Sequence, residues 1–292
     1  MRSCVVGVNW CVWALVMGVF LASGSQGRAD EVPTELLSAL LEGHNRERAA
    51  ASLPPLTLNA KLNAAAQGHA RDMADHDKMT HDGSDGSTPA QRIERQHYNF
   101  RASGENVAEG QTSVAEVMKG WMNSPPHKKN ILGDFKEMGA GRAASSDGTL
   151  YWSVDFGLPW IALDPAQASS DVVAALNRAR ADAKKPPLSV AAALQSAALR
   201  HARAMAAAGK FVAKDDDGLT PFERVEKSGF RFKRLDESVA SGRPTPEAVA
   251  QNWLESPSSR DHLLGASASI GVGYAAASNG VPYWCLLIAE PR

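Results

Sequence analysis

The sequence predicts an α+β protein that consists of two copies of one domain, and three observations lead to this prediction. Apolar residues recur at helical spacing in segments that begin at capping residues and end at prolines or polar runs. Two strand-like segments are joined by an Asp-Gly pair, which is typical of a tight turn. The same order of segments then starts again 132 residues further along the 292-residue chain.

Two helices are expected at the start of the first copy. The first covers 31–52, with leucines at helical spacing, and Pro54-Pro55 breaks it. The second begins after Asn59, whose side chain is a good helix cap, and runs to about His76. A polar loop over 77–87 follows.

Shorter elements complete the first copy. Thr88-Pro89 starts a short helix, with threonine as the cap and proline in the first turn. Ser113 caps a further helix that carries Trp121. The segments 138–144 and 150–156 are expected to form an antiparallel hairpin.

The repeat indicates a tandem duplication. Residues 44–157 align with 176–289 without a gap, and about 40 of the 114 pairs are identical, where roughly 7 would match by chance. We therefore expect a first domain over 33–157, a linker over 158–170 and a second domain over 171–290.

The N-terminus has the layout of a secretory signal peptide. Arg2 precedes an uncharged apolar run, Val5–Ala22, and small residues follow up to a cleavage position after Ala29. The expectation is a signal peptide over 1–29 and a secreted or cell-envelope protein. Because the run is barely long enough to span a bilayer, an uncleaved membrane anchor is the alternative.

Charge and cysteine content exclude some functions. Without the leader, 29 basic and 32 acidic side chains leave a net charge of −3, which argues against nucleic acid or an anionic membrane surface as a partner. Cys4 and Cys11 lie in the leader, so Cys285 alone remains and an intramolecular disulfide is impossible. The domains are expected to depend on their apolar cores.

The segment 103–132 carries the motifs that identify a family. GENVA at 104–108 suggests a turn, and WMNSPPHKKNIL at 121–132 contains a corner that Ser124 is expected to cap. With Gly139-Ala140-Gly141 and Tyr151-Trp152 downstream, this order resembles the bacterial branch of the CAP superfamily (SCP domain: cysteine-rich secretory, antigen 5 and pathogenesis-related proteins). The resemblance implies two α-β-α sandwiches, each a small, mainly antiparallel sheet between helical layers.

The resemblance also implies a cleft lined by two histidines and two acids. It places the histidines at His81 and His127 and the first acid at Glu105, with Asn106 beside it, whereas the second acid position is Ser124. Two neutral imidazoles can bind Zn²⁺ or Cu²⁺ with water completing the coordination. The alternatives are histidines that bond to the backbone and a Glu105 that holds its loop through backbone N–H groups.

The second copy lacks most of these side chains. At the aligned positions, the second copy has Leu176 for His44, Ala213 for His81, Ser238 for Asn106 and Ser259 for His127. Glu105 persists as Glu237, which favours a structural role, and His69 with its match His201 is also interpreted as structural. His44 is expected on the surface or packed, with a position facing the cleft as the alternative, and the run 46–48 is expected in solvent.

The functional expectation is an exported, non-enzymatic binding module. The first-copy cleft would hold a lipid, a cell-envelope component or a divalent metal, with zinc as the candidate cofactor. One alternative is a peptidase-like hydrolase with His81 or His127 as base and Glu105 as the orienting group. The other is a structural envelope protein with an inactive cleft.

Overall fold

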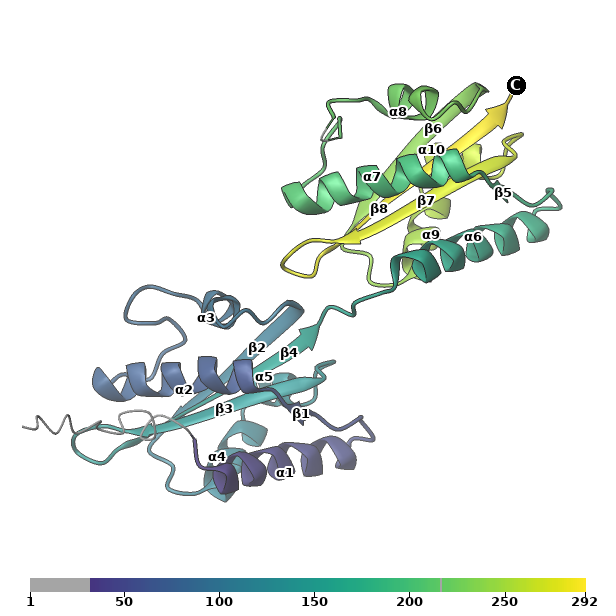
Figure 1. Ribbon diagram of the computed structural model, residues 1–292. Helices are drawn as coiled ribbons and strands as arrows, with labels where there is room; N and C mark the ends of the chain where they lie inside the picture. Colours follow the sequence, from purple (N-terminus) through teal and green to yellow (C-terminus); the bar gives the residue numbers. More distant parts are fainter. Residues whose placement is uncertain (1–31, 216) are drawn as a thin grey trace, which may run out of the picture. The chain divides into compact units, whose positions relative to one another are not determined.

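The computed structural model describes residues 32–215 and 217–292 (Figure 1). The signal peptide expected over 1–29, with its cleavage position and the anchor alternative, lies outside the described residues. Among the residues that are described, no helix is both long and apolar enough to cross a membrane.

The first domain is a four-stranded sheet between two layers of helices. Its elements are α1 (Thr34–Ala50), β1 (Thr57–Leu58), α2 (Ala60–Asp75), α3 (Pro89–Arg95), β2 (Phe100–Glu109), α4 (Val114–Asn123), α5 (Pro125–Ile131), β3 (Glu137–Ala144) and β4 (Leu150–Pro159). The strand order is β1-β3-β4-β2, with β1 parallel to β3 and the other pairs antiparallel. α2 packs on one face of the sheet, and α1 and α4 lie on the other (Figure 1).

The second domain repeats this architecture. Its elements are α6 (Pro165–Asp182), β5 (Ser189–Val190), α7 (Ala192–Ala208), α8 (Pro221–Lys227), β6 (Phe232–Ser241), α9 (Pro246–Glu255), α10 (Pro257–Leu263), β7 (Ser269–Ala276) and β8 (Pro282–Pro291). The strand order is β5-β7-β8-β6, with the same directions. The predicted pair of α-β-α sandwiches is confirmed.

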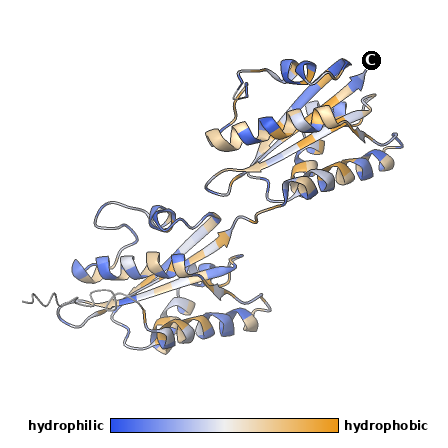
Figure 2. Cartoon of the chain, viewed as in Figure 1, coloured by the Kyte–Doolittle hydropathy of each residue, from blue (hydrophilic) through white to orange (hydrophobic). Residues whose placement is uncertain are grey.

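Each domain has its own apolar core on both faces of its sheet. Hydrophobic residues line the inner sides of the helices and the central strands (Figure 2). In the first domain Trp121 and Trp152 are almost completely buried in the core that α1 and α4 cover. Burying such aromatic side chains supplies a large share of the hydrophobic free energy, so the domains hold without a disulfide.

Local signals placed the helix starts well. The side chain of Asn59 accepts hydrogen bonds at the start of α2, Thr88 forms a capping box with Gln91, and Ser113 caps α4. The segment between the domains is shorter than the predicted linker 158–170. β4 continues to Pro159, and α6 begins at Pro165 because Asp164 caps it.

Two local predictions are wrong. Gly104, Glu105 and Asn106 do not form a turn but lie within β2, where each pairs with a residue of β4. Ser124 does occupy the N-cap position of α5, but its side chain makes no capping hydrogen bond. Pairing with β4 overrides the local turn preference of glycine and asparagine.

Arg48 is not in solvent, in contrast to the prediction. Only 1% of it is exposed, and its guanidinium donates to the carbonyl oxygens of Pro54, Ile131, Gly133 and Phe135 at 2.7–3.2 Å. Arg180 makes the matching set of bonds in the second domain. Each arginine therefore ties the first helix of its domain to the segment that precedes β3 in the first domain or β7 in the second.

Candidate functional site

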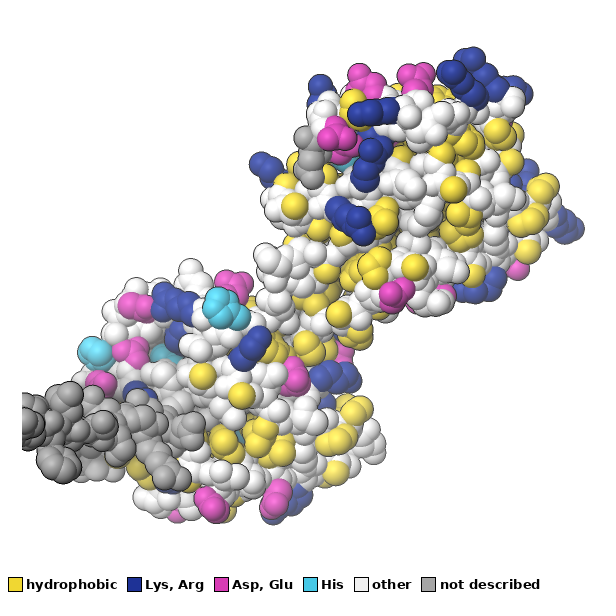
Figure 3. Space-filling view, in the orientation of Figure 1, with side chains coloured by type: hydrophobic (Ala, Val, Ile, Leu, Met, Phe, Trp, Pro, Cys, Tyr) yellow, Lys and Arg dark blue, Asp and Glu magenta, His cyan; other side chains and the backbone are white. Residues whose placement is uncertain are grey.

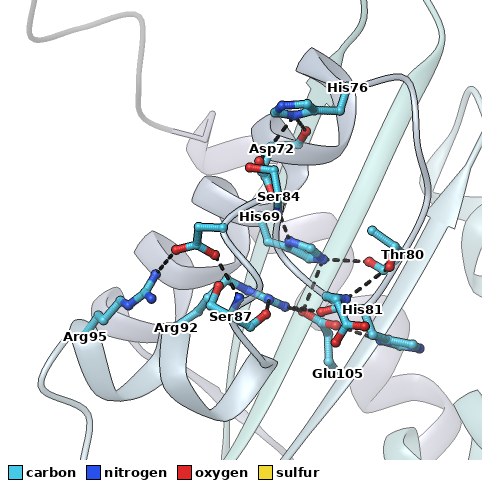
Figure 4. A network of polar contacts seen from close by, with 12 residues as sticks. His69, Asp72, His76, Thr80, His81, Ser84, Ser87, Arg92, Arg95 and Glu105 are labelled. Carbon is cyan, nitrogen blue, oxygen red and sulfur yellow. Dashed lines mark hydrogen bonds and ion pairs between the residues drawn. The ribbon is translucent and has the colours of Figure 1, made fainter.

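Glu105 is the centre of a buried polar network in the first domain (Figure 4). It lies on β2, the edge strand, and only 6% of it is exposed. One carboxylate oxygen, Oε1, accepts from Nδ1 of His81 at 2.7 Å, and the other, Oε2, accepts from the guanidinium of Arg92 at 2.5 Å. No backbone N–H group is among these donors, so the backbone hydrogen bonds predicted for this carboxylate are replaced by bonds to two side chains.

Arg92 secures both Glu105 and the loop that carries His81. It sits on α3, and it also donates to the carbonyl oxygens of Ser87 at 2.8 Å and His81 at 3.0 Å. The capping box at Thr88 fixes the start of α3 and so the position of this arginine. Sequence analysis missed Arg92, although its match Arg224 is kept in the second copy.

His69 also belongs to the network. It is fully buried on α2, its Nε2 donates to the carbonyl oxygen of Thr80 at 2.7 Å, and the same nitrogen is 3.8 Å from Oε2 of Glu105. Burial lowers its pKa, so the ring is neutral at physiological pH with the proton on Nε2. The structural role predicted for His69 is consistent with this position, in which it fixes Thr80 next to His81.

His81 is the part of the network that reaches solvent. Its side chain is 54% exposed, and the hydrogen bond to Glu105 raises its pKa. Because Nδ1 donates to Glu105, the neutral ring carries its lone pair on Nε2. This arrangement presents one oriented nitrogen to a ligand.

His127 is joined by a hydrogen bond to Asn106, which is next to Glu105 in the chain. Asn106 is buried and donates to the carbonyl oxygen of His127 at 3.1 Å, and Asn130 donates to the side-chain oxygen of Asn106 at 2.9 Å. The pKa of His127 is lowered by partial burial and by the nearby His81. The two predicted histidines are therefore close enough to sense each other's charge.

Ser124 is not joined to this group. It is partly exposed at the start of α5, and among the residues that the structure describes it shares no hydrogen bond with Glu105 or either histidine. The structure thus brings together His81 and Glu105, and Asn106 and His127, but leaves Ser124 apart from them.

A further acid that the sequence analysis missed lies next to Glu105 on the neighbouring strand. Asp155 of β4 is directly opposite Glu105 in the strand register and only 1% exposed. Its match in the second copy is Leu287. The comparison of the copies could have singled out this residue, because an acid present in one copy only is a candidate for a site.

The capacity of this site for a metal is limited. Within 32–215 and 217–292, no group of three or more His, Cys, Asp or Glu side chains is arranged to hold a metal ion. A metal at His81 and His127 would have two imidazole ligands and complete its coordination with water or a bound molecule.

The second domain keeps the support of the site and lacks the histidines. Arg224 donates to Glu237 at 2.7 Å, and His201 lies 3.8 Å from the same carboxylate. At the matching positions the hydroxyls of Ser238 and Ser259 bond to each other at 2.9 Å. The shared arginine–glutamate pair is therefore part of the fold, and the exposed imidazoles are specific to the first domain.

The first domain thus combines a small sheet between helical layers with a histidine that is held by a glutamate of the edge strand. The family model described as "CAP: Cysteine-rich secretory protein family" matches residues 41–156 and 173–288. The chain therefore belongs to this family, and the predicted tandem duplication is confirmed.

Bacterial proteins are among its relatives. The chain is 32% identical over 118 residues to the uncharacterized protein YkwD of Bacillus subtilis, and 27% identical over 112 residues to the uncharacterized membrane protein YlbC of the same organism. These matches cover 40% and 38% of this chain but 45% and 32% of the relatives, so the chain spans less than half the length of either.

Two solved structures match less than half of the chain. An outer surface protein from Borrelia burgdorferi is 27% identical, with a TM-score of 0.41 and coverage of 43% of this chain and 94% of that one. An extracellular SCP-domain protein from Bacillus anthracis is also 27% identical, with a TM-score of 0.39 and coverage of 42% and 40%.

Proposed function

We propose that the chain is an exported binding protein whose first domain binds a ligand through His81, with His127 beside it. The hydrogen bond from Nδ1 of His81 to the buried Glu105 is the observation that carries this proposal. A carboxylate that fixes the tautomer and the orientation of an exposed imidazole is the usual support of a binding nitrogen.

Binding suits this site better than hydrolysis. Both oxygens of Glu105 already accept charge-assisted hydrogen bonds, from His81 and from Arg92, so the carboxylate is engaged in holding these two side chains. Ser124, the hydroxyl that the motif places near His127, makes no hydrogen bond to it. Glu105 therefore acts as an orienting group.

The ligand class that fits the two imidazoles is a divalent metal ion such as Zn²⁺. Nε2 of His81 is available in the tautomer that Glu105 selects, and the lowered pKa of His127 keeps that ring neutral, as metal binding requires. The metal would serve as a point of attachment for a cell-envelope component, because water or a ligand must fill its remaining positions.

Calorimetric titration of the purified protein with Zn²⁺ tests this proposal. We expect binding near one ion per chain that is lost in the double variant His81→Ala/His127→Ala. The matched control is His97→Asn, which changes an exposed histidine outside the network at a position of positive φ that asparagine tolerates.

Two outcomes would contradict the metal assignment. One is no heat of binding to the wild-type protein, and the other is unchanged binding in the double variant. The double variant could also bind Zn²⁺, lipids and envelope fragments as the wild type does and differ only in thermal stability. That result would support the structural role instead.

A further inference from the structure

Asp155 is an anomaly in the core of the first domain. It lies on β4 under α2, only 1% is exposed, and neither carboxyl oxygen accepts a hydrogen bond from the described residues. Burying an ionised carboxylate without a partner is among the most costly events in folding, so such a group normally keeps its proton.

The groups packed around Asp155 do not neutralise it. β2 contributes Glu105 directly opposite, α3 contributes Arg92 and α2 contributes His69. Arg92 donates to Glu105 and to two carbonyl oxygens, and His69 is neutral and donates to Thr80. Among the described residues, the donors of the network are therefore directed to Glu105 or to carbonyl oxygens, and none donates to Asp155.

Two opposed carboxyl groups in a buried site do not both ionise. Directly opposite side chains on antiparallel strands have Cβ atoms about 5 Å apart. Glu105 accepts hydrogen bonds from His81 and Arg92, whereas Asp155 accepts none from the described residues. Burial, and then the charge of Glu105, raise the pKa of Asp155 well above its ordinary value of 3.8.

We propose that Asp155 is a positioning residue of the site, a buried carboxylic acid that keeps its proton and directs that O–H group as a donor to Glu105. It would be the second acid of the site, supplied by β4 and not by the helix corner at Ser124. By donating to the Glu105 carboxylate from the neighbouring strand, Asp155 fixes the orientation that this carboxylate gives to His81. The effect of Asp155 on a ligand rests on the proposed function, but the protonation of Asp155 does not.

The second domain is a natural comparison for this assignment. It has Leu287 where the first has Asp155, Cys285 where the first has Ser153, and no histidine at the position of His81. It keeps the Arg224–Glu237 pair on the same fold. The buried acid therefore accompanies the exposed histidine and is not needed by the sheet.

Two variants separate the proton from the shape of the side chain. Asp155→Asn keeps the donor and the size but has no proton to release, and Asp155→Leu introduces the residue of the second domain. The first measurement is the unfolding equilibrium of wild type and Asp155→Asn as a function of pH. Because the folded-state pKa is raised, the folded form binds more protons than the unfolded form above pH 3.8.

The stability of the wild type should therefore fall relative to Asp155→Asn as the pH rises from about 4. The ratio of their unfolding constants should grow about tenfold per pH unit while the folded protein keeps the proton. Parallel curves, or a wild type that gains stability with rising pH, would show an acid that ionises in the folded state and would overturn the proposal.

The second measurement reads the positioning role. The ¹⁵N shifts of the His81 ring, assigned by their loss in His81→Ala, report which ring nitrogen carries the proton. We expect the Nδ1-protonated tautomer in wild type and in Asp155→Asn, and a mixture of tautomers in Asp155→Leu. An unchanged ring in the leucine variant would leave Asp155 no positioning role.

Neither measurement uses a metal. If Zn²⁺ fails to bind and both results are as expected, Asp155 positions His81 and the ligand assignment is wrong. If Zn²⁺ binds and either result fails, the proposed function stands without Asp155.

Discussion

His44 shows how a single residue can make the stability of this protein depend on pH. It is completely buried on α1, its Nδ1 donates to the carbonyl oxygen of Leu40 at 2.7 Å, and its ring packs against Trp121 and Phe156. Burial lowers its pKa from 6.5 to about 4. His44 is thus packed in the core, which is one of the positions predicted for it, and it does not reach the site.

The His44 ring should cost stability in acid. Below pH 6.5 the unfolded chain binds a proton at His44, whereas the folded domain binds it only near pH 4. The contribution of the neutral ring to stability is therefore fully present above pH 6.5 and is lost as the pH falls from 6.5 to about 4. The loss amounts to roughly 3 kcal/mol. His44→Leu, which introduces the residue of the second domain, should remove this dependence in chemical unfolding at pH 5 and pH 8. An equal effect at both values would refute the neutral, buried ring.

At the scale of the elements, the contact between α2 and β3 explains the Gly-Ala-Gly motif. A Cβ on Gly139 would lie 2.0 Å from the backbone carbon of Leu62, and one on Gly141 would lie 2.4 Å from the backbone of Gln67. Gly271 and Gly273 meet α7 in the same way in the second domain. The glycines therefore permit helix and strand backbones to touch.

Gly139→Ala should push α2 away from the sheet. We expect a loss of about 3 kcal/mol in urea unfolding, because the clash is with backbone and not with a flexible side chain. Gly120→Ala is the matched control, since that glycine is exposed within α4 with open space around it, and alanine there should add about 0.5–1 kcal/mol. A Gly139 variant as stable as wild type would contradict the close approach.

The elements that the sequence predicted are those with local signals. Asn59, Thr88 and Ser113 each indicate a helix within a few residues, and the hairpin of β3 and β4 closes on an adjacent Asp-Gly pair. β2 was missed because its pairing with β4 joins residues about 50 positions apart, which no local pattern records.

The site divides in the same way. Motifs located His81, Glu105 and His127, but the donors that decide the state of Glu105 come from elsewhere in the chain. Arg92 looked like one of many charged residues on a helix, and Asp155 like one position of a strand. Only the fold shows that both face one carboxylate.

At the scale of the whole molecule, the two domains have separate cores made from their own residues. Both arginines that tie helix to loop are buried, and each bonds only within its own domain. On the exposed face in Figure 3, side chains of both charges are scattered over the two domains, in keeping with the net charge of −1 for the full chain.

We expect two heat-absorption transitions in scanning calorimetry, each sensitive to one arginine. Arg48→Ala should lower the free energy of unfolding of the first domain, and Arg180→Ala that of the second. Each loss should be on the order of 3 kcal/mol, because buried carbonyl groups lose their charged donor. A single transition that both variants shift alike would show that the domains unfold as one unit.

The buried Arg48 also sets a time at which the first domain can fold. Its carbonyl partners at Ile131, Gly133 and Phe135 lie 83–87 residues downstream, so the helix that carries it must wait for them during synthesis. β4 is complete at Pro159, before α6 begins at Pro165. A chain that emerges from its N-terminus onward therefore presents every strand of the first sheet before any strand of the second.

A chain refolded from denaturant lacks that order. All eight strands among the described residues are then available together, and β1 or Arg48 can meet the matching partners of the wrong copy. Exchange between similar neighbouring domains is a characteristic misfolding route of repeat proteins. Synthesis from the N-terminus onward thus disfavours pairing between elements of one copy and the matching partners of the other.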